Sequence, residues 1–163
     1  MDTALRCTGF GVVEFNEKGG ALIIDCGFIK TPARKPVSEC LRRLSGGITE
    51  LIQTYAPDEI AIEGTFFHKY ARSAMLLGMA RGAVVSVGAM HALPIYEYAP
   101  KAAKKAVTGS GRSSKEQVAF MMANMLGIKI NDMPLDATDA LSLAVCHYQN
   151  SKLPAEIRNK SVL

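Results

Sequence analysis

Two stretches near the N-terminus, rich in β-branched and aromatic side chains, predict strands over residues 9–16 and 21–29. Between them, Glu17-Lys18-Gly19-Gly20 has the polar and glycine character of a tight turn. The two strands are therefore expected to pair as a hairpin. A loop punctuated by Pro32 and Pro36 follows.

Apolar residues at helical spacing predict a first helix from Val37 to Tyr55, with a bend where Gly46-Gly47 interrupts the pattern. Short apolar runs and longer helical segments then follow one another along the chain. They predict strands over residues 58–63 and 93–98 and helices over residues 71–92 and 101–107. A further helix is expected from a Ser113/Ser114 cap to about Leu126, with Gly127 at its end. The last helix is expected from Pro134 to about Asn150.

This order of elements predicts an α/β domain in which a mixed sheet is covered by helices on both faces. The length of 163 residues suits one domain, which we place at residues 1–150, followed by a polar tail over residues 151–163. The apolar fraction of 48% is enough for a sizeable core.

Composition also gives an expected location for the protein. No apolar stretch is expected to reach the roughly 20 residues that cross a bilayer, and the N-terminus shows no basic and apolar leader. We therefore expect a cytoplasmic protein. The four cysteines are scattered without a CxxC pair and are expected to be reduced structural thiols: Cys7, Cys26, Cys40 and Cys146.

Four acidic residues in three blocks carry the candidate chemistry: Asp2, Glu63, Asp136 and Asp139. Glu63 ends a short apolar run, which places it at a strand end. Asp136 and Asp139 lie three apart at the head of an apolar segment, and such positions share one face of a helix. A knot of carboxylates is costly unless cations compensate it. Oxygen ligands of this kind suit Mg²⁺ or Mn²⁺, and two such ions about 3.5–4 Å apart are usual in phosphodiester hydrolysis.

Each acid also has an ordinary structural interpretation. Asp136 could be an acid at a helix start, favoured there by the helix dipole, and Glu63 an exposed strand terminus. Asp2 is expected at the end of a buried strand, yet the chain begins one residue before it. An apolar strand of about five residues is therefore expected to be missing. An upstream start codon or a trimmed chain explains this better than a true loss.

A basic stripe runs from Ala99 to Lys115 without a single acid. Beside an acidic cavity, such a stripe fits a polyanion held near bound cations. A solvated helix face is the alternative, and the net charge of +4 is too weak a signal to decide. The basic residues of the stripe are Lys101, Lys104, Lys105, Arg112 and Lys115.

Taken together, these blocks resemble the RuvC family of Holliday junction resolvases, from Asp2 to about His147. Five segments in the right order carry the resemblance, and any one alone would be weak. They are Asp2-Thr3-Ala4-Leu5-Arg6-Cys7-Thr8-Gly9-Phe10-Gly11; Ile62-Glu63-Gly64-Thr65-Phe66-Phe67; Arg72-Ser73-Ala74 with Gly78-Met79-Ala80-Arg81-Gly82; Tyr96-Glu97-Tyr98-Ala99-Pro100 with Lys104-Lys105-Ala106-Val107-Thr108-Gly109; and Asp136-Ala137-Thr138-Asp139-Ala140-Leu141 with His147.

The resemblance implies an RNase H-like α/β fold, with a mixed five-stranded sheet flanked by helices and its first strand truncated here. It implies a homodimeric endonuclease that resolves four-way (Holliday) DNA junctions in homologous recombination and DNA repair. Cutting is expected as symmetric nicking with two Mg²⁺ ions per active site, for which Mn²⁺ is an expected substitute. The expected partners are junction DNA and a branch-migration complex of the RuvA and RuvB type, with no membrane.

The family's functional residues fall on matching positions of this sequence. Its catalytic, metal-binding acids fall on Asp2, Glu63, Asp136 and Asp139. Phe66 falls where the family places an aromatic residue against junction bases, and we prefer it to Phe67 for this role. Arg72 falls on a DNA contact. Lys104 and Lys115 fall on basic residues near the scissile phosphate, and Lys105 completes the expected DNA-binding set.

Three positions depart from the family pattern: Thr3 replaces a proline, and Gly64 and Met79 each replace a glutamine. The change at Gly64 removes a polar side chain beside the expected metals. Together with the missing strand, it favours an alternative, a catalytically impaired junction-binding protein of the same fold. The four acids favour cutting. A nuclease of this fold that acts on RNA is a second alternative, disfavoured by the basic segment.

Other residues receive weaker interpretations. His147 lies two helical turns after Asp139 and could approach the site, but an ordinary helix-face position is preferred. His91 is expected to be structural. Small residues at Ala80, Gly82 and Ala83 would allow close helix approach in a dimer. Methionines are expected in core or dimer packing: Met75, Met79, Met121, Met122 and Met125.

Overall fold

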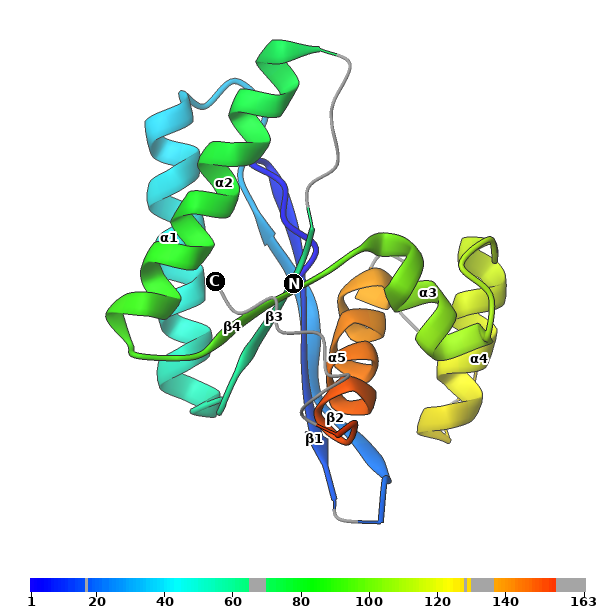
Figure 1. Cartoon of the computed structure of the whole chain (residues 1–163). Coiled ribbons are helices and arrows are strands. Elements are labelled where there is room, and N and C mark those ends of the chain that lie inside the picture. The colour runs from blue at the N-terminus through cyan, green and yellow to red at the C-terminus, as the bar shows by residue number, and fades with distance from the viewer. Residues whose placement is uncertain (17, 65–69, 128, 130–136, 155–163) are drawn as a thin grey trace.

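The computed structural model describes residues 1–16, 18–64, 70–127, 129 and 137–154 (Figure 1). The predicted order of strands and helices is confirmed. Described element ends lie within two residues of the expected ones, except at the start of α5, which the prediction placed at Pro134, outside the described residues. The elements are β1 (Cys7–Phe15), β2 (Ala21–Lys30), α1 (Val37–Tyr55), β3 (Ile60–Glu63), α2 (Ala71–Met90), β4 (Ile95–Tyr98), α3 (Pro100–Thr108), α4 (Lys115–Leu126) and α5 (Thr138–Ser151).

The described strands form two pairs. β1 and β2 make the predicted antiparallel hairpin, from Cys7 opposite Lys30 to Phe15 opposite Ala21. β3 and β4 are parallel, with Glu63 opposite Tyr98 at their shared end. Parallel strands need a long crossover connection, and α2 supplies it.

A short bridge joins the two strand pairs at the place of the first strand, which was predicted to be truncated. Asp2 exchanges two backbone hydrogen bonds with Gly9 of β1, at 3.0 and 2.9 Å. On the other side, the amide of Glu63 donates to the Met1 carbonyl at 3.1 Å, and the Met1 amino group donates to the Ala61 carbonyl at 2.5 Å. Four strands are therefore found among the described residues, because this bridge is too short to count as one. Beyond it, a cavity of about 530 Å³ separates β1 from β3.

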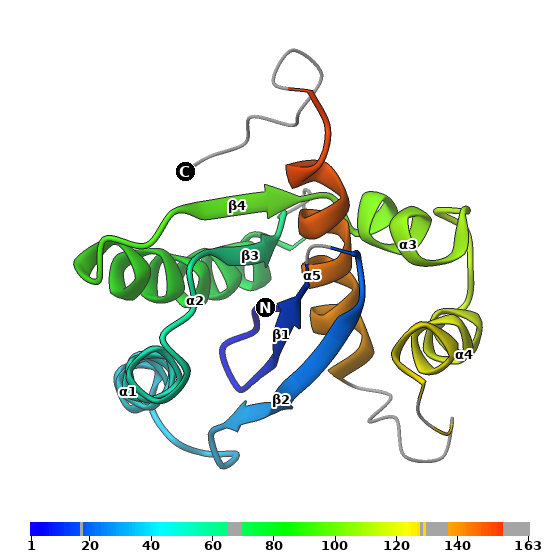
Figure 2. The same cartoon turned by 90° about the horizontal axis from the view of Figure 1, so that it is seen from below.

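Helices cover both faces of these strands, as predicted. Figures 1 and 2 show α1 and α2 on one face and α5 on the other, with α3 and α4 beyond α5. The first core lies between α1, α2 and the β3–β4 pair and includes the fully buried Leu44, Ile62 and Val84. α1 runs from Val37 to Tyr55 as predicted and continues through Gly46 and Gly47, where the predicted bend stays a prediction. At Gly47, α1 packs closely on β2, because an added Cβ would lie 3.0 Å from Ile29.

α2 differs from the other helices in how little of it is covered. By length and composition alone it could cross a membrane, contrary to the expectation from the sequence, and 22% of that window is buried. Ala80, Val84 and Val87 face the core, while Met75, Met79 and Met90 are exposed. Ala80 is fully buried within the chain, so its predicted place at a dimer interface is wrong.

The second core joins α3, α4 and α5 to the hairpin. Leu141 and Val145 of α5 pack with Met122 of α4 and with residues of β1 and β2. α4 begins with a capping box, in which the Ser114 side chain accepts from the Gln117 backbone and the Gln117 side chain accepts from the Ser114 backbone. This rigid start fixes Lys115, the first residue of the helix, above the start of α5.

Candidate active site

Three of the predicted acids come from three different elements that meet near the centre of the fold. Asp2 lies in the bridge to β1, Glu63 is the last residue of β3, and Asp139 lies in the first turn of α5. Figure 1 shows the N-terminus, the end of β3 and the first turn of α5 converging at the centre of the fold. The fourth acid, Asp136, lies outside the described residues.

The electrostatics of Glu63 show that these carboxyls affect one another. The pKa of Glu63 is raised from 4.5 to about 7, first by burial of the side chain. A hydrogen bond between the Asp2 and Glu63 carboxyls contributes next, followed by the negative charges of Asp2 and Asp139. Removing this repulsion requires a proton or a cation, and a carboxylate donor set suits hard divalent ions.

The described residues do not by themselves form a closed metal cage. Within residues 1–16, 18–64, 70–127, 129 and 137–154, no three His, Cys, Asp or Glu side chains lie close enough together to hold a metal ion. Asp2 and Glu63 are in contact, and Asp139 lies within electrostatic range of Glu63. The chemistry of the donors fits a hard divalent ion, while its full set of protein ligands depends on Asp136.

Two lysines of the basic stripe lie at the corner where α3 meets α4. The Lys115 ammonium lies 3.2 Å from the Asp139 carboxylate, which places a positive charge at the edge of the acidic cluster. The Lys104 ammonium donates to the Ser113 carbonyl at 3.3 Å, so it holds the loop that leads into α4. Thr108 adds a 2.8 Å hydrogen bond to the Ser113 hydroxyl. The predicted nearness of Lys115 to the acids is therefore found.

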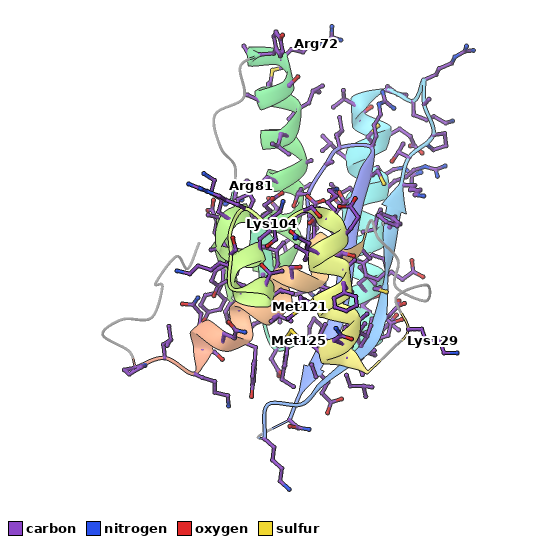
Figure 3. All side chains as sticks on the ribbon, turned by 90° about the vertical axis from the view of Figure 1, so that its right-hand side faces the viewer. Arg72, Arg81, Lys104, Met121, Met125 and Lys129 are labelled. Carbon is purple, nitrogen blue, oxygen red and sulfur yellow. The ribbon has the colours of Figure 1, made fainter. Side chains whose placement is uncertain are left out.

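The other predicted DNA-binding residues are more widely spread. Arg72 is exposed in the first turn of α2, and Figure 3 shows it at the outer end of that helix, away from Lys104. Lys105 is exposed on α3. Phe66, the predicted stacking residue, lies outside the described residues. The structure thus brings Lys104 and Lys115 to one corner and leaves Arg72 on a separate part of the surface.

An ion pair behind β3 holds the backbone of Glu63. Arg81 of α2 donates to the Glu63 carbonyl at 2.9 Å and pairs with the Glu97 carboxylate at 2.5 Å. Gly64 permits this arrangement, because an added Cβ would lie 2.8 Å from the Glu97 carboxylate. The space beside Gly64 is therefore occupied by Glu97. Neither Arg81 nor Glu97 was assigned a role from the sequence, although both lie inside matched family segments.

At the far end of β3, His147 joins a separate polar network. Its Nε2 lies 2.5 Å from the Glu59 carboxylate, and its Nδ1 lies 2.8 Å from the Tyr98 hydroxyl. Tyr96 completes the group, with its hydroxyl donating to Glu59 at 3.3 Å and its ring 4.5 Å from the imidazole. His147 thus has the helix-face position preferred from the sequence and does not contact Asp2, Glu63 or Asp139.

Comparisons with known proteins show the family to which the chain belongs. The family model described as Crossover junction endodeoxyribonuclease RuvC matches residues 1–147. The chain is 42% identical to the protein of that name from Oleidesulfovibrio alaskensis over 154 residues, covering 94% of this chain and 90% of the relative. It is 42% identical to the one from Pseudomonas fluorescens, covering 94% and 88%.

Solved structures give the same result for the fold. A structure described as Thermus thermophilus RuvC in complex with Holliday junction substrate superposes with a TM-score of 0.85 at 30% identity, covering 93% of this chain and 92% of that one. The yeast mitochondrial Holliday junction resolvase is similar at a TM-score of 0.54 and 14% identity, which supports the fold alone. The predicted RNase H-like fold class is confirmed.

Proposed function

The chain belongs to the RuvC family of crossover junction endodeoxyribonucleases, and on that premise we propose how its own residues resolve a Holliday junction. The observation that carries the proposal is the gathering of Asp2, Glu63 and Asp139 from three elements at one place. There, burial first, and then the hydrogen bond to Asp2 and the charges of Asp2 and Asp139, raise the pKa of Glu63 to about 7. Such a cluster is poorly suited to stability alone and well suited to holding cations beside a phosphate.

The family consists of metal-dependent nucleases, and the finer proposal is two Mg²⁺ ions per site. Asp2, Glu63, Asp136 and Asp139 would hold them. When bound, such ions supply an activated water and neutralise charge on the leaving 3′ oxygen. The carboxylates orient the site, and products would carry 5′-phosphate and 3′-hydroxyl ends.

The basic corner of α3 and α4 would act on the phosphate. Lys115 pairs with Asp139 in the free protein, and its ammonium is placed to turn toward a bound phosphate. Lys104 holds the corner through the Ser113 carbonyl. Arg72 and Lys105 would contact DNA backbone farther out, and Phe66 would stack on bases opened near the cut.

We propose a homodimer that pairs the exposed face of α2 with its copy. Met75 and Met79 on this face are 55% and 40% exposed, an unusual surface for apolar side chains of this size. Gly78 and Gly82 have nothing within 4 Å of an added Cβ, so a second helix could approach there. A two-fold dimer places one site on each of two opposed strands of a junction.

Two further proposals concern the setting of the activity. A cytoplasmic location and a branch-migration partner of the RuvA and RuvB type follow from the same family membership. Both concern the protein in the cell. Co-purification of a tagged chain with junction-bound RuvA and RuvB proteins tests the partnership, and cell fractionation tests the location.

The alternative is a junction-binding protein of the same fold that does not cut. Its ground is Gly64, which stands where the family has a glutamine beside the expected metals. The distinguishing experiment incubates the purified protein with a synthetic four-way junction, a linear duplex and an RNA–DNA hybrid, each with Mg²⁺ or with a chelator. Symmetric nicks in the junction alone, only with Mg²⁺, support the proposal. Tight junction binding without nicks would favour the alternative, and cutting of the hybrid would favour an RNA nuclease.

A further inference from the structure

β3 and α5 are also joined by hydrogen bonds at the end opposite Asp2, Glu63 and Asp139. We call this group, formed by Glu59, His147 and Tyr98, the polar closure. Glu59 directly precedes β3, and His147 lies two helical turns after Asp139 on α5. Their side chains are paired at 2.5 Å. A neutral imidazole satisfies both of its contacts, because Nε2–H donates to the carboxylate while Nδ1 accepts the Tyr98 hydroxyl proton.

Tyr98 links this closure back to the acidic end. Its side chain is 2% exposed and therefore held firmly by its surroundings. Its hydroxyl contacts His147, while its carbonyl accepts a 2.8 Å hydrogen bond from the amide of Gly64, the residue after Glu63. One side chain of α5 is thus tied to the start of β3 through Glu59 and to the end of β3 through Tyr98.

From this network we infer that His147 is a positioning residue, which fixes α5 along β3 and so sets Asp139 against Glu63 and Asp2. The inference rests on the proposed function, in which these acids bind metal. His147 acts through the Glu59–His147–Tyr98 contacts and makes no contact with Asp2, Glu63 or Asp139.

The polar closure would counteract the repulsion among Asp2, Glu63 and Asp139. Their charges favour separation of α5 from β3 at the acidic end, and the closure at the other end opposes sliding or rotation of the helix. A metal site formed by two elements loses affinity when one element shifts. Loss of an outer residue that orients metal ligands typically costs about 10- to 100-fold in metal affinity or activity.

The test measures Mn²⁺ binding to the full chain without DNA, by electron paramagnetic resonance, alongside junction cutting at increasing Mg²⁺. The variants are His147→Ala, Tyr98→Phe, which removes only a hydroxyl, and Glu59→Gln, which keeps an acceptor for Nε2–H. His91→Ala is the matched control, because His91 is an exposed histidine at the end of α2. All are measured at a temperature where melting curves show them folded.

We expect His147→Ala to weaken Mn²⁺ binding about tenfold and to raise the Mg²⁺ concentration for half-maximal cutting by a similar factor. Junction affinity should stay unchanged, excess Mg²⁺ should restore most cutting, and Glu59→Gln should lie nearer the parent. Should His147→Ala not fold at any temperature, Tyr98→Phe decides, with a smaller shift of about two- to threefold in the same direction.

Two outcomes separate this inference from the function on which it rests. Parent-like Mn²⁺ binding and Mg²⁺ dependence in the folded variants overturn the positioning role and leave the nuclease intact. A parent that binds Mn²⁺ but does not cut a junction contradicts the proposed function, while the Mn²⁺ measurements still decide the role of His147. A parent that binds no Mn²⁺ overturns both.

Discussion

β3 and α5 lie against each other along their length, and a β3-side carboxylate meets the helix at each end. At one end, Glu59 meets His147, the Tyr96 hydroxyl donates to Glu59, and the Tyr98 hydroxyl contacts His147. At the other end, Glu63 lies among the like charges of Asp2 and Asp139. The two ends belong to the same pair of elements, but the carboxylate has hydrogen-bond partners at one end and like-charged neighbours at the other.

The difference separates what holds the fold from what performs the chemistry. The Glu59 end is satisfied within the chain, so its acid is compensated without any ligand. The Glu63 end leaves repulsion that a bound cation would relieve, with Lys115 as partial compensation from α4. Sites that break local rules of stability are where function is expected.

Of the variants considered, Glu63→Gln is expected to have the largest effect: it should abolish cutting and stabilise the metal-free protein. Cutting should be lost, because an amide binds Mg²⁺ poorly in place of a carboxylate. The metal-free protein should become more stable by about 1–2 kcal/mol at pH 8, after allowance for solvent screening of a partly buried group. Chemical unfolding with a chelator, beside junction cutting, measures both. Glu14→Gln, at an exposed position of β1, is the control.

The stability difference should depend on pH. Because the pKa of Glu63 is raised from 4.5 to about 7 in the folded state, the folded protein binds this proton more tightly than the unfolded chain. The stability of the metal-free parent therefore falls as pH rises from about 4.5 to about 7 and levels off above that range. Glu63→Gln should lack this fall. A variant whose stability follows the parent at every pH would show that the pKa of Glu63 is not raised in the folded protein.

Arg81→Ala tests whether the hydrogen bond from Arg81 to the backbone carbonyl of Glu63 contributes to cutting, as the Glu63 carboxyl is expected to. Arg81 is 15% exposed and partners both the Glu63 carbonyl and Glu97. We expect a loss of about 2 kcal/mol in unfolding free energy, since Glu97 is left partly buried without its partner. Cutting should fall about tenfold at saturating Mg²⁺. Arg81→Lys, which keeps the charge, should recover part of both. Unchanged cutting in a folded variant would show that Arg81 does not contribute to the position of Glu63 in the active site.

Lys115→Ala should lower cutting about tenfold with little effect on stability, because the pair with Asp139 is largely exposed to solvent. Single-turnover cutting and thermal melting measure the two effects separately. Lys129→Ala, a change at another exposed lysine, which Figure 3 labels, is the matched control. Equal cutting by the two variants would mean that Lys115 is only a surface charge.

Lys104→Ala is expected to have the smallest effect. It should weaken junction binding modestly and reduce the log–log salt slope by about 0.9 if Lys104 contacts one phosphate. Binding titrations at several salt concentrations check this. An unchanged slope combined with slower cutting would assign Lys104 to holding the Ser113 loop instead.

Much of the fold could be predicted because local signals and tertiary packing agree. The Ser114 cap, the Gly127 end and the helical spacing from Val37 to Tyr55 are all found where expected. α1 also continues through Gly46-Gly47, because packing of Gly47 against Ile29 compensates for the low helix propensity of glycine. Ala80 was misplaced because α2 is apolar on all sides, so composition could not show which face meets the core.

The site was only partly predictable for a similar reason. The acids and Lys115 lie in segments whose chemistry is visible in the sequence. The roles of Arg81, Glu97 and Glu59 depend on contacts between distant elements, such as the pair of Glu59 with His147, 88 residues apart. The effect of Gly64 was interpreted as a lost polar group, whereas the structure shows that it makes room for Glu97. Asp136 and Phe66 stay predictions from the sequence.

The most direct test of the central claim is Asp139→Asn measured on a synthetic four-way junction in Mg²⁺, with cutting and binding followed on the same samples. The substitution removes one charge from the acidic end and leaves the Glu59–His147 end untouched. We predict that cutting falls below a few per cent of the parent rate, while junction binding is equal or tighter because a charge that repels DNA is gone. Cutting close to the parent rate, with normal binding, would contradict the assignment of this end as the active site.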